Sequence, residues 1–189
     1  MPRKKETLEL LKLKLKRTEL LLEINSQVAE LNDLTQILWK IIQFLTEELK
    51  AERGTLFLND DETNELYSRI AQGALTREIR ILNNVGIAGA IFQSQKGEII
   101  HDVYKDSRFN EEVDQETSYK TKNMICCPVK TIGGKTIGVI EVLNKKRGRF
   151  TKDNLIFSEA AATRAAKSIQ NAKEYAFQSV LLEMSSRFD

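Results

Sequence analysis

The feature that most constrains this chain is a pair of β-favouring runs on either side of two adjacent glycines. The runs NMICCPVKT and KTIGVIEVLN carry Val and Ile, and Gly133 and Gly134 lie between them. Glycine adopts positive φ without a steric penalty, and a tight hairpin turn requires that conformation. We therefore predict that the two runs pair as an antiparallel hairpin, which commits this part of the chain to a sheet.

Four further strands are expected before this hairpin. The runs GTLFLND and LYSRIAQ are separated by a cluster of turn-forming residues, so they are predicted to pair antiparallel. REIRIL and GEIIHDV follow as a third and a fourth strand. With helical segments between and after the strands, the sequence predicts an α/β (α+β) fold in which helices flank a six-stranded antiparallel sheet.

Helical patterns occupy the N-terminal part of the chain. Apolar residues recur at helical spacing from about Thr7 to Leu31, and Asn32 and Asp33 then stand as candidate N-caps of a second helix that ends near Lys50. We expect residues 1–31 to form a signalling and dimerisation helix. Its apolar stripe consists of Leu8, Leu11, Leu15 and Leu22.

Another long helix is expected at the C-terminal end, from a cap at Thr151 to about Arg187. A helix of about 35 residues is roughly 50 Å long, whereas a domain of this size is roughly 30 to 40 Å across, so the helix must protrude. A protruding apolar stripe favours a homodimer, and the alternative is a helix that covers only its own sheet. We assign 32–172 to the central domain and 173–189 to a helix that connects to a further domain. The stripe consists of Ala161, Ala165, Ile169, Ala172, Ala176 and Val180.

The charge balance argues against partners that need a strong electrostatic field. The 189 residues include 29 Lys and Arg against 27 Asp and Glu, which gives a net charge of +2. So small a charge attracts neither nucleic acid nor an anionic membrane strongly. Lys and Glu recur among the apolar N-terminal positions, which fits neither a signal peptide nor a membrane span. We expect a cytoplasmic protein with one hydrophobic core.

The cysteine and histidine content predicts neither a disulfide nor a metal site. Cys126 and Cys127 are adjacent in a predicted strand, so their side chains point to opposite faces and are expected to be buried thiols. His101 is the only histidine, too little for a metal cluster. We therefore expect no metal or cofactor, and no nucleophile with a base beside it.

Two glycines bracket Ile87 and Ala88 just before a predicted helix. Gly86 ends a loop and Gly89 permits a close backbone approach, so the free N–H groups of the helix point at whatever lies in front of them. A helix N-terminus carries about half a positive charge, which suits a phosphate without any Lys or Arg. A turn with close packing explains the same glycines, so the pattern alone leaves both interpretations open.

The polar segment from Asp106 to Thr121 is predicted to contain a short helix that begins near Ser107. Asp114, Thr117 and Thr121 recur at helical spacing, so one acid and two hydroxyls face the same side. Such a face suits either a ribose phosphate or solvent.

A carboxylate interrupts the apolar side of the last strand. Glu141 shares strand parity with Ile137, Val139 and Leu143. A buried carboxylate costs free energy unless it has a partner. Either a ligand or an exposed sheet edge accounts for Glu141.

These motifs together resemble a GAF domain. The matching stretches are ERGTLFLND, REIRILNNVGIAGAIFQSQKGEII, DSRF, YKTKNMICCPV and IGVIEVLNK, and the resemblance spans about Glu30 to Ala172. Their order is similar to that of the cyclic-nucleotide-binding GAF domains of cyanobacterial adenylate cyclases and mammalian phosphodiesterases. The resemblance implies a non-enzymatic sensor domain that binds a cyclic nucleotide and passes a signal through dimeric helices to an output domain.

The resemblance also implies which residues hold the sugar and the phosphate. Ile87 and Ala88 would offer backbone groups to the cyclic phosphate and ribose, with Asn110 beside them. The residues implied to close over the ribose and phosphate are Asp114, Thr117 and Thr121.

The base would meet Arg53 and Thr55, which lie two apart and so project to one face of the first strand. A guanidinium donor beside a hydroxyl matches the acceptors and amine of adenine, whereas guanine sets its N1–H against the guanidinium, so cyclic AMP is favoured over cyclic GMP. An ion pair of Arg53 with Glu52 or Glu65, or acceptance from guanine by Glu141, is the alternative. Glu141 is implied to line the pocket floor. The residues implied to pack beside the base are Ile70, Ala71 and Gln72.

The sequence departs from the family pattern in two places. Where phosphodiesterase-type domains tend to carry an aromatic residue that stacks on the purine, only aliphatic side chains are available near Ile70. The family's NKFDE pattern, which implies a structural Lys–Asp pair, is incomplete. Of that pattern Asn144, Lys145, Phe150 and Asp153 remain, and Asn154 stands where Glu is expected.

Two other classes of function compete with a nucleotide sensor. Some GAF proteins reduce methionine sulfoxide, but the adjacent Cys126 and Cys127 are not placed to attack and resolve. A bilin or haem sensor lacks a Cys–His pair or an axial ligand. The stronger alternative is a ligand-free GAF module that serves as a dimerisation spacer.

Overall fold

The computed structural model describes residues 33–73 and 78–185, together with seven single positions before them. These seven, at 8, 11, 12, 15, 18, 19 and 22, are all helical. Most of the predicted N-terminal helix, the candidate cap Asn32 and the expected helix end at Arg187 lie outside the described residues. Within the predicted stripe, the exposed leucines are Leu8, Leu11, Leu15 and Leu22.

A six-stranded sheet forms the centre of the fold, with the strand order β3-β2-β1-β6-β5-β4. All pairs of neighbouring strands are antiparallel, which confirms the predicted sheet. The third and fourth strands have three residues each and are shorter than the predicted runs. The strands are β1 (Ala51–Asp60), β2 (Glu65–Ala71), β3 (Arg80–Leu82), β4 (Glu98–Ile100), β5 (Met124–Lys130) and β6 (Thr136–Lys145).

The hairpin of β5 and β6 turns on one glycine, not two. Gly134 has φ +84°, whereas Gly133 is not among the residues with positive φ, contrary to the expectation that both would supply it. The turn closes with backbone hydrogen bonds from Gly134 N to Thr131 O (2.9 Å) and from Thr131 N to Lys135 O (2.9 Å). A single residue with positive φ is therefore enough for this turn.

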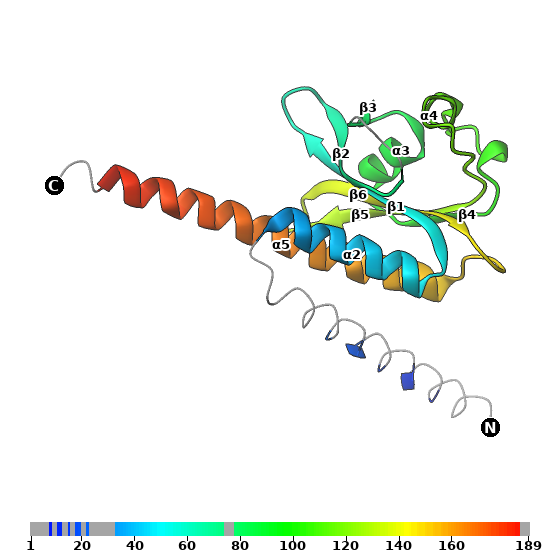
Figure 1. The fold of residues 1–189 in the computed structure, drawn as a ribbon, viewed down its shortest axis with the longest axis horizontal. Coiled ribbons are helices and arrows are strands. Elements are labelled where there is room, and N and C mark those ends of the chain that lie inside the picture. The colour runs from blue at the N-terminus through cyan, green and yellow to red at the C-terminus, as the bar shows by residue number, and fades with distance from the viewer. Residues whose placement is uncertain are drawn as a thin grey trace.

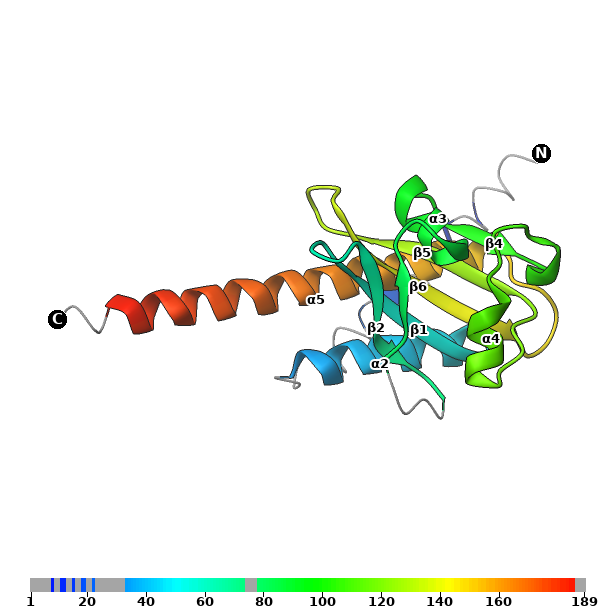
Figure 2. The same cartoon turned by 90° about the horizontal axis from the view of Figure 1, so that it is seen from above.

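Helices cover both faces of the sheet (Figures 1 and 2). α2 (Leu34–Glu48) and α5 (Lys152–Ser185) pack side by side on one face, and α3 (Gly86–Ser94) and α4 (Glu111–Thr117) lie on the other. A short 3₁₀ helix, Val103–Lys105, follows β4. The sheet is thus the middle layer of three.

Side-chain caps begin both long helices at the expected residues. Asp33 accepts a hydrogen bond from Thr35 N (2.9 Å) at the start of α2. At the start of α5, Thr151 Oγ1 accepts from Asn154 N (3.3 Å), and Asn154 Oδ1 accepts from Thr151 N (3.1 Å). This reciprocal pair is a capping box in which Asn takes the usual place of Glu, so Asn154 has a structural role of its own.

The sheet separates two hydrophobic cores. The larger core lies between the sheet and the α2–α5 pair and includes Leu38, Leu56, Ile70 and Ile140. The smaller core lies under α3 and includes Phe57, Ile87, Ile91, Met124 and Val139. Because successive residues of a strand face opposite layers, Leu56 and Phe57 belong to different cores.

α5 extends well beyond the sheet (Figure 1). Its first half buries Ala161, Ala165 and Ile169 as predicted, but Ala176 further along the same stripe is exposed. With 34 residues the helix is roughly 50 Å long. The side chain of Val180 lies outside what the structure describes. Among the described residues, no helix combines the length and hydropathy that a membrane crossing needs.

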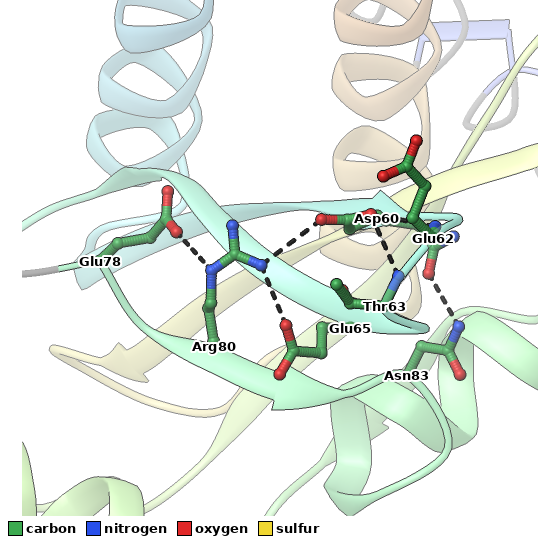
Figure 3. Close-up of polar contacts among 8 residues, drawn as sticks. Asp60, Glu62, Thr63, Glu65, Glu78, Arg80 and Asn83 are labelled. Atoms are coloured by element: carbon green, nitrogen blue, oxygen red, sulfur yellow. Dashed lines mark hydrogen bonds and ion pairs between the residues drawn. The ribbon is translucent and has the colours of Figure 1, made fainter.

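Ion pairs of Arg80 join the short strand β3 to the β1–β2 hairpin (Figure 3). Its guanidinium contacts Glu78 (2.7 Å), Glu65 (2.9 Å) and Asp60 (3.5 Å). Next to β3, Asn83 Nδ2 donates to Asn59 Oδ1 (2.9 Å), which ties the chain to β1 just before α3 begins. These contacts fix the point from which α3 starts.

Candidate ligand-binding site

A cavity of about 100 Å³ lies between the sheet and the layer of α3 and α4. Side chains from β1 and β6 form its floor, and the first turn of α3 and the segment from 109 to 121 form its walls. Of the predicted site residues, those that line the cavity are Arg53, Thr55, Gln72, Ile87, Ala88, Asn110, Asp114, Thr121 and Glu141.

The N-terminus of α3 opens into this cavity. Its N-cap residue Val85 makes no side-chain capping bond. Ile87 and Ala88, which follow Gly86, are buried. The first N–H groups of a helix have no acceptor within the helix, so these amides are available to an anion. A Cβ on Gly89 would lie 2.8 Å from the carbonyl carbon of Asn84, so close packing accounts for this glycine.

α4 is shorter than predicted at both ends. It begins after the cap Asn110, whose Oδ1 accepts from Glu112 N (3.0 Å), and not near Ser107. The preceding residues form a turn in which Phe109 N donates to Asp106 O (3.0 Å). The helix stops at Ser118, which has φ +50°. The segment after α4 therefore returns toward the sheet as a loop.

Asp114 and Thr121 meet through this loop and not along a helix face. Thr121 donates to the Asp114 carboxylate from its hydroxyl (2.7 Å) and from its backbone N–H (2.6 Å), and Tyr104 OH adds a third bond (3.0 Å). Burial and this carboxylate raise the pKa of Tyr104. The protein thus supplies three hydrogen bonds to this carboxylate. Thr117 ends α4, and its side chain lies outside the described part.

Glu141 is half-buried on the cavity floor and makes no hydrogen bond or ion pair with any described residue. Burial, together with the nearby charge of Asp114, raises the pKa of Glu141 to about 7. The neutral and charged forms of Glu141 therefore interconvert near neutral pH. A carboxyl in this state donates or accepts a hydrogen bond according to its protonation.

Arg53 lies at one end of the cavity under the ring of Tyr119, with Cζ 3.8 Å from the ring centroid. Neither Glu52 nor Glu65 forms an ion pair with Arg53. Glu65 binds Arg80, and the Glu52 carboxylate accepts from Tyr119 OH (2.8 Å) and from an asparagine. The guanidinium is therefore held by stacking.

Two residues expected beside the base do not line the cavity. Ile70 is buried in the core against α2 and α5, because it pairs with Leu56 on β1 and shares its face. Ala71 pairs with Thr55 but is not part of the cavity wall. Gln72 does line the cavity, and its Oε1 accepts a hydrogen bond from Gly54 N (2.9 Å).

Aromatic and apolar side chains that the sequence analysis did not assign complete the cavity. Strand parity with the predicted residues on β1 and β6 would have identified Phe57 and Leu143, whereas the others come from β3, α4, β5 and irregular segments. The nine are Phe57, Ile79, Ile81, Val85, Phe109, Val113, Tyr119, Met124 and Leu143.

The remnant NKFDE residues make other contacts than the family pattern implies. Lys145 Nζ donates to Leu49 O at the end of α2, and it does not pair with Asp153. Asn144, with φ +55°, accepts from Lys122 N (2.7 Å) and donates to Glu52 (3.0 Å). Asn144 therefore holds the loop after α4 against the end of β6.

The cysteines are buried and unpaired, as expected. Burial raises the pKa of both Cys126 and Cys127. A buried thiol with a raised pKa is a poor nucleophile. Within the part of the chain that is described, no three His, Cys, Asp or Glu side chains group as metal ligands would.

Comparison with known protein families gives a match to the GAF domain over residues 33–169. The chain belongs to the GAF domain family. This match covers the sheet, α2 and the half of α5 that packs on the sheet, and it confirms the resemblance noted in the sequence.

Proteins related to this GAF domain include cyclic nucleotide phosphodiesterases. The probable 3',5'-cyclic phosphodiesterase pde-5 of Caenorhabditis elegans is 32% identical over 151 residues, which are 74% of this chain and 21% of that protein. The cGMP-specific 3',5'-cyclic phosphodiesterase of Drosophila ananassae is 31% identical over 190 residues, 88% of this chain and 16% of that protein. This GAF chain thus spans about a fifth or less of these relatives.

A solved structure has the same fold at lower sequence identity. The GAF domain of a phosphoenolpyruvate-protein phosphotransferase from Coxiella burnetii superimposes with a TM-score of 0.76 at 19% identity, over 85% of this chain and 96% of that one. At this identity the likeness establishes the GAF fold alone.

Proposed function

We propose that this GAF domain is a regulatory domain that binds a cyclic nucleotide in the cavity beneath α3 and α4. The observation that carries the proposal is the uncapped N-terminus of α3, whose first amides face a cavity floored by the sheet. The relationship to proteins named as cyclic phosphodiesterases supports the same ligand class.

The charges around the cavity favour the α3 amides as the phosphate site. Arg53 is the only basic residue among the described residues that line the cavity, and Asp114 and Glu141 are acidic. A phosphate therefore avoids the two carboxyl groups when it lies at the positive end of α3, near Ile87 and Ala88. The ribose then falls beneath Thr121 and Asn110.

Binding requires the cavity to expand. Small-molecule sites usually enclose about 300 Å³ or more, whereas this cavity has about 100 Å³. We expect α4, Glu111–Thr117, to be the part that moves, because residues 119 and 120 after it are tied to the sheet by Glu52 and Asn144. In place of their mutual bond, the Thr121 hydroxyl would then donate to the phosphate, and the Asp114 carboxylate would accept from a ribose hydroxyl.

We propose that the base is adenine. Arg53 makes no hydrogen bond with the described residues, so its donors are available to the ring-nitrogen acceptors, with the Thr55 hydroxyl beside them. When guanine presents its Watson–Crick edge to Arg53, its N1–H would face the guanidinium with a second donor. We expect cyclic AMP to bind about tenfold to a hundredfold more tightly than cyclic GMP, and Arg53→Ala to remove most of that preference. Tighter binding of cyclic GMP contradicts this assignment.

The domain is proposed to act without catalysis, as a cytoplasmic homodimer. The exposed half of α5, with Tyr175 70% and Phe177 64% exposed, supplies an apolar surface for a second copy. Residues 1–31 and 173–189 would then carry the signal between the cavity and a further domain. Sedimentation of the chain at tens of micromolar tests the dimer, and a monomer with and without nucleotide contradicts it.

The small cavity favours a second candidate, a spacer that binds nothing. Thermal unfolding with cyclic AMP, cyclic GMP and non-cyclic 5'-AMP separates the two. A ligand at 100 times its dissociation constant stabilises the folded state by about 2.7 kcal/mol, which is a shift of several degrees. A melting temperature that none of the three nucleotides raises supports the spacer.

A further inference from the structure

The guanidinium of Arg53 has two close neighbours. One is the ring of Tyr119, whose centroid lies 3.8 Å from Cζ. The other is the backbone of Gly73, where an added Cβ would lie 2.8 Å from Cζ and from Nη1. Gly73 has φ +126°, a conformation that favours glycine, so the close approach has no competing side chain.

The ring of Tyr119 is itself anchored from outside the cavity. Its hydroxyl donates to Glu52 Oε2 (2.8 Å), and the same oxygen accepts from Asn144 Nδ2 (3.0 Å). Asn144 also donates to Lys120 O (2.9 Å), next to Tyr119 in the chain. Glu52 is ionised under these contacts, because the bonds from Asn144 and Tyr119 lower its pKa. The orientation of the ring is therefore set by β1 and by the end of β6.

Arg53 is restrained but not satisfied. It lines the cavity, and none of its donors has a hydrogen-bond partner among the described residues. Stacking holds the plane of a guanidinium and leaves its edge free for hydrogen bonds. A donor group held in place before the ligand arrives loses less conformational entropy on binding.

We propose that Tyr119 is a positioning residue that fixes the plane of Arg53 and so determines which base the cavity prefers. The inference rests on the proposed nucleotide function and assigns part of its specificity to a residue that reaches the cavity from the loop after α4. Without the ring, Arg53 has many orientations and meets the donors and acceptors of either base equally well.

The experiment compares the ratio of the dissociation constants for cyclic GMP and cyclic AMP across variants of the full chain. Tyr119→Leu removes the stacking surface, Tyr119→Phe keeps it, and Arg53→Ala removes the stacked group. Tyr67→Leu is the matched control, because Arg80 lies over the Tyr67 ring (5.4 Å) away from the cavity. Circular dichroism confirms that each variant is folded.

We expect a ratio that departs from one by about tenfold in the unchanged chain, in Tyr119→Phe and in the control. The ratio should approach one in Tyr119→Leu and in Arg53→Ala. The double variant that carries both substitutions should have the same ratio as either single variant. If Tyr119 had only a structural role, Tyr119→Leu would weaken the binding of both nucleotides by the same factor and leave the ratio of dissociation constants unchanged.

Gly73→Ala provides an independent test if Tyr119→Leu does not fold, since the added methyl group displaces the guanidinium and leaves the Tyr119 side chain in place. Because φ +126° strains an alanine, circular dichroism and thermal unfolding check the fold of this variant first. Gly73→Ala should also bring the ratio toward one. A ratio that stays near its original value in Tyr119→Leu or in Gly73→Ala overturns the positioning role while nucleotide binding stands. Absence of binding, or equal binding of both nucleotides, in the unchanged chain overturns it as well, and absence also overturns the proposed function.

Discussion

Glu141 makes the stability of this domain depend on pH in a direction opposite to that of an ordinary surface carboxyl. Its pKa rises from 4.5 to about 7 on folding, first because the carboxyl is buried and second because Asp114 lies nearby. Between these values the folded state holds a proton that the unfolded state has released. Stability therefore falls as pH rises through this interval, and the loss is complete above the folded pKa.

The magnitude follows from the two pKa values. With about 1.4 kcal/mol for each pKa unit, the rise of the Glu141 pKa from 4.5 to about 7 corresponds to about 3 kcal/mol. Glu141→Gln has no proton to lose. Relative to the unchanged chain, this variant should gain up to about 3 kcal/mol in the free energy of unfolding between pH 4 and pH 8.

Urea unfolding at several pH values measures this difference. Trp39 is the only tryptophan and is 42% exposed in α2, so its fluorescence reports on the packing of that helix, with circular dichroism as a second probe. The protein concentration is held constant because association would alter apparent stability. Glu62→Gln, in the exposed turn between β1 and β2, is the control.

Stability curves for Glu141→Gln and the unchanged chain that run parallel from pH 4 to pH 8 would refute this reasoning. So would a variant that loses stability at high pH. Either result would mean that Glu141 is well solvated or paired in the folded state.

Four further substitutions test the site and its supports. Thr121→Val removes one of three hydrogen bonds to the Asp114 carboxylate, so the free energy of unfolding should fall by about 1.5 to 3 kcal/mol in urea titrations, and no measurable change would indicate that water replaces the bond. The double variant Thr121→Val with Asp114→Asn should change the free energy of unfolding and the nucleotide affinity by amounts that differ from the sums of the two single changes, because the two residues share a contact. Sums that match would contradict this contact. Gly89→Ala places a methyl group against the Asn84 backbone and should cost about 1 to 3 kcal/mol in thermal unfolding, whereas an unchanged melting temperature would show that α3 shifts freely. Asn144→Ala removes bonds to the loop after α4 and should speed amide hydrogen exchange there, and exchange equal to that of the unchanged chain would argue against this support.

Local sequence patterns predicted the sheet and the start of α3 well. The runs around Gly134 are rich in Val and Ile and flank turn-forming glycines, and the close approach of Gly89 to Asn84 is short-range geometry that needs no tertiary information. The same is true of the caps Asp33 and Thr151, whose side chains bond within three residues. Such features depend on neighbours in the chain, which is why they can be predicted from it.

The contents of the cavity depend on contacts between distant segments, and prediction was weaker there. A register shift between Leu56 and Phe57 in the β1–β2 pairing accompanies the placement of Ile70 against the α2–α5 core, and no residue pattern marks that shift. Asp114 and Thr121 do come together, but through a loop that returns after Ser118 and not along one helix. Tyr119 enters the cavity from an irregular segment that has no periodicity to analyse.

Isothermal titration calorimetry of the chain with cyclic AMP and with cyclic GMP tests the central proposal most directly. Occupancy of the cavity under α3 and α4 predicts saturable binding at one nucleotide per chain, with cyclic AMP bound at least about tenfold more tightly. Ala88→Pro, which removes one amide from the first turn of α3, should weaken the binding of both nucleotides, and circular dichroism checks that the variant is folded. Absence of saturable heat with either nucleotide at millimolar concentration would contradict the proposal that this GAF domain is a cyclic-nucleotide sensor.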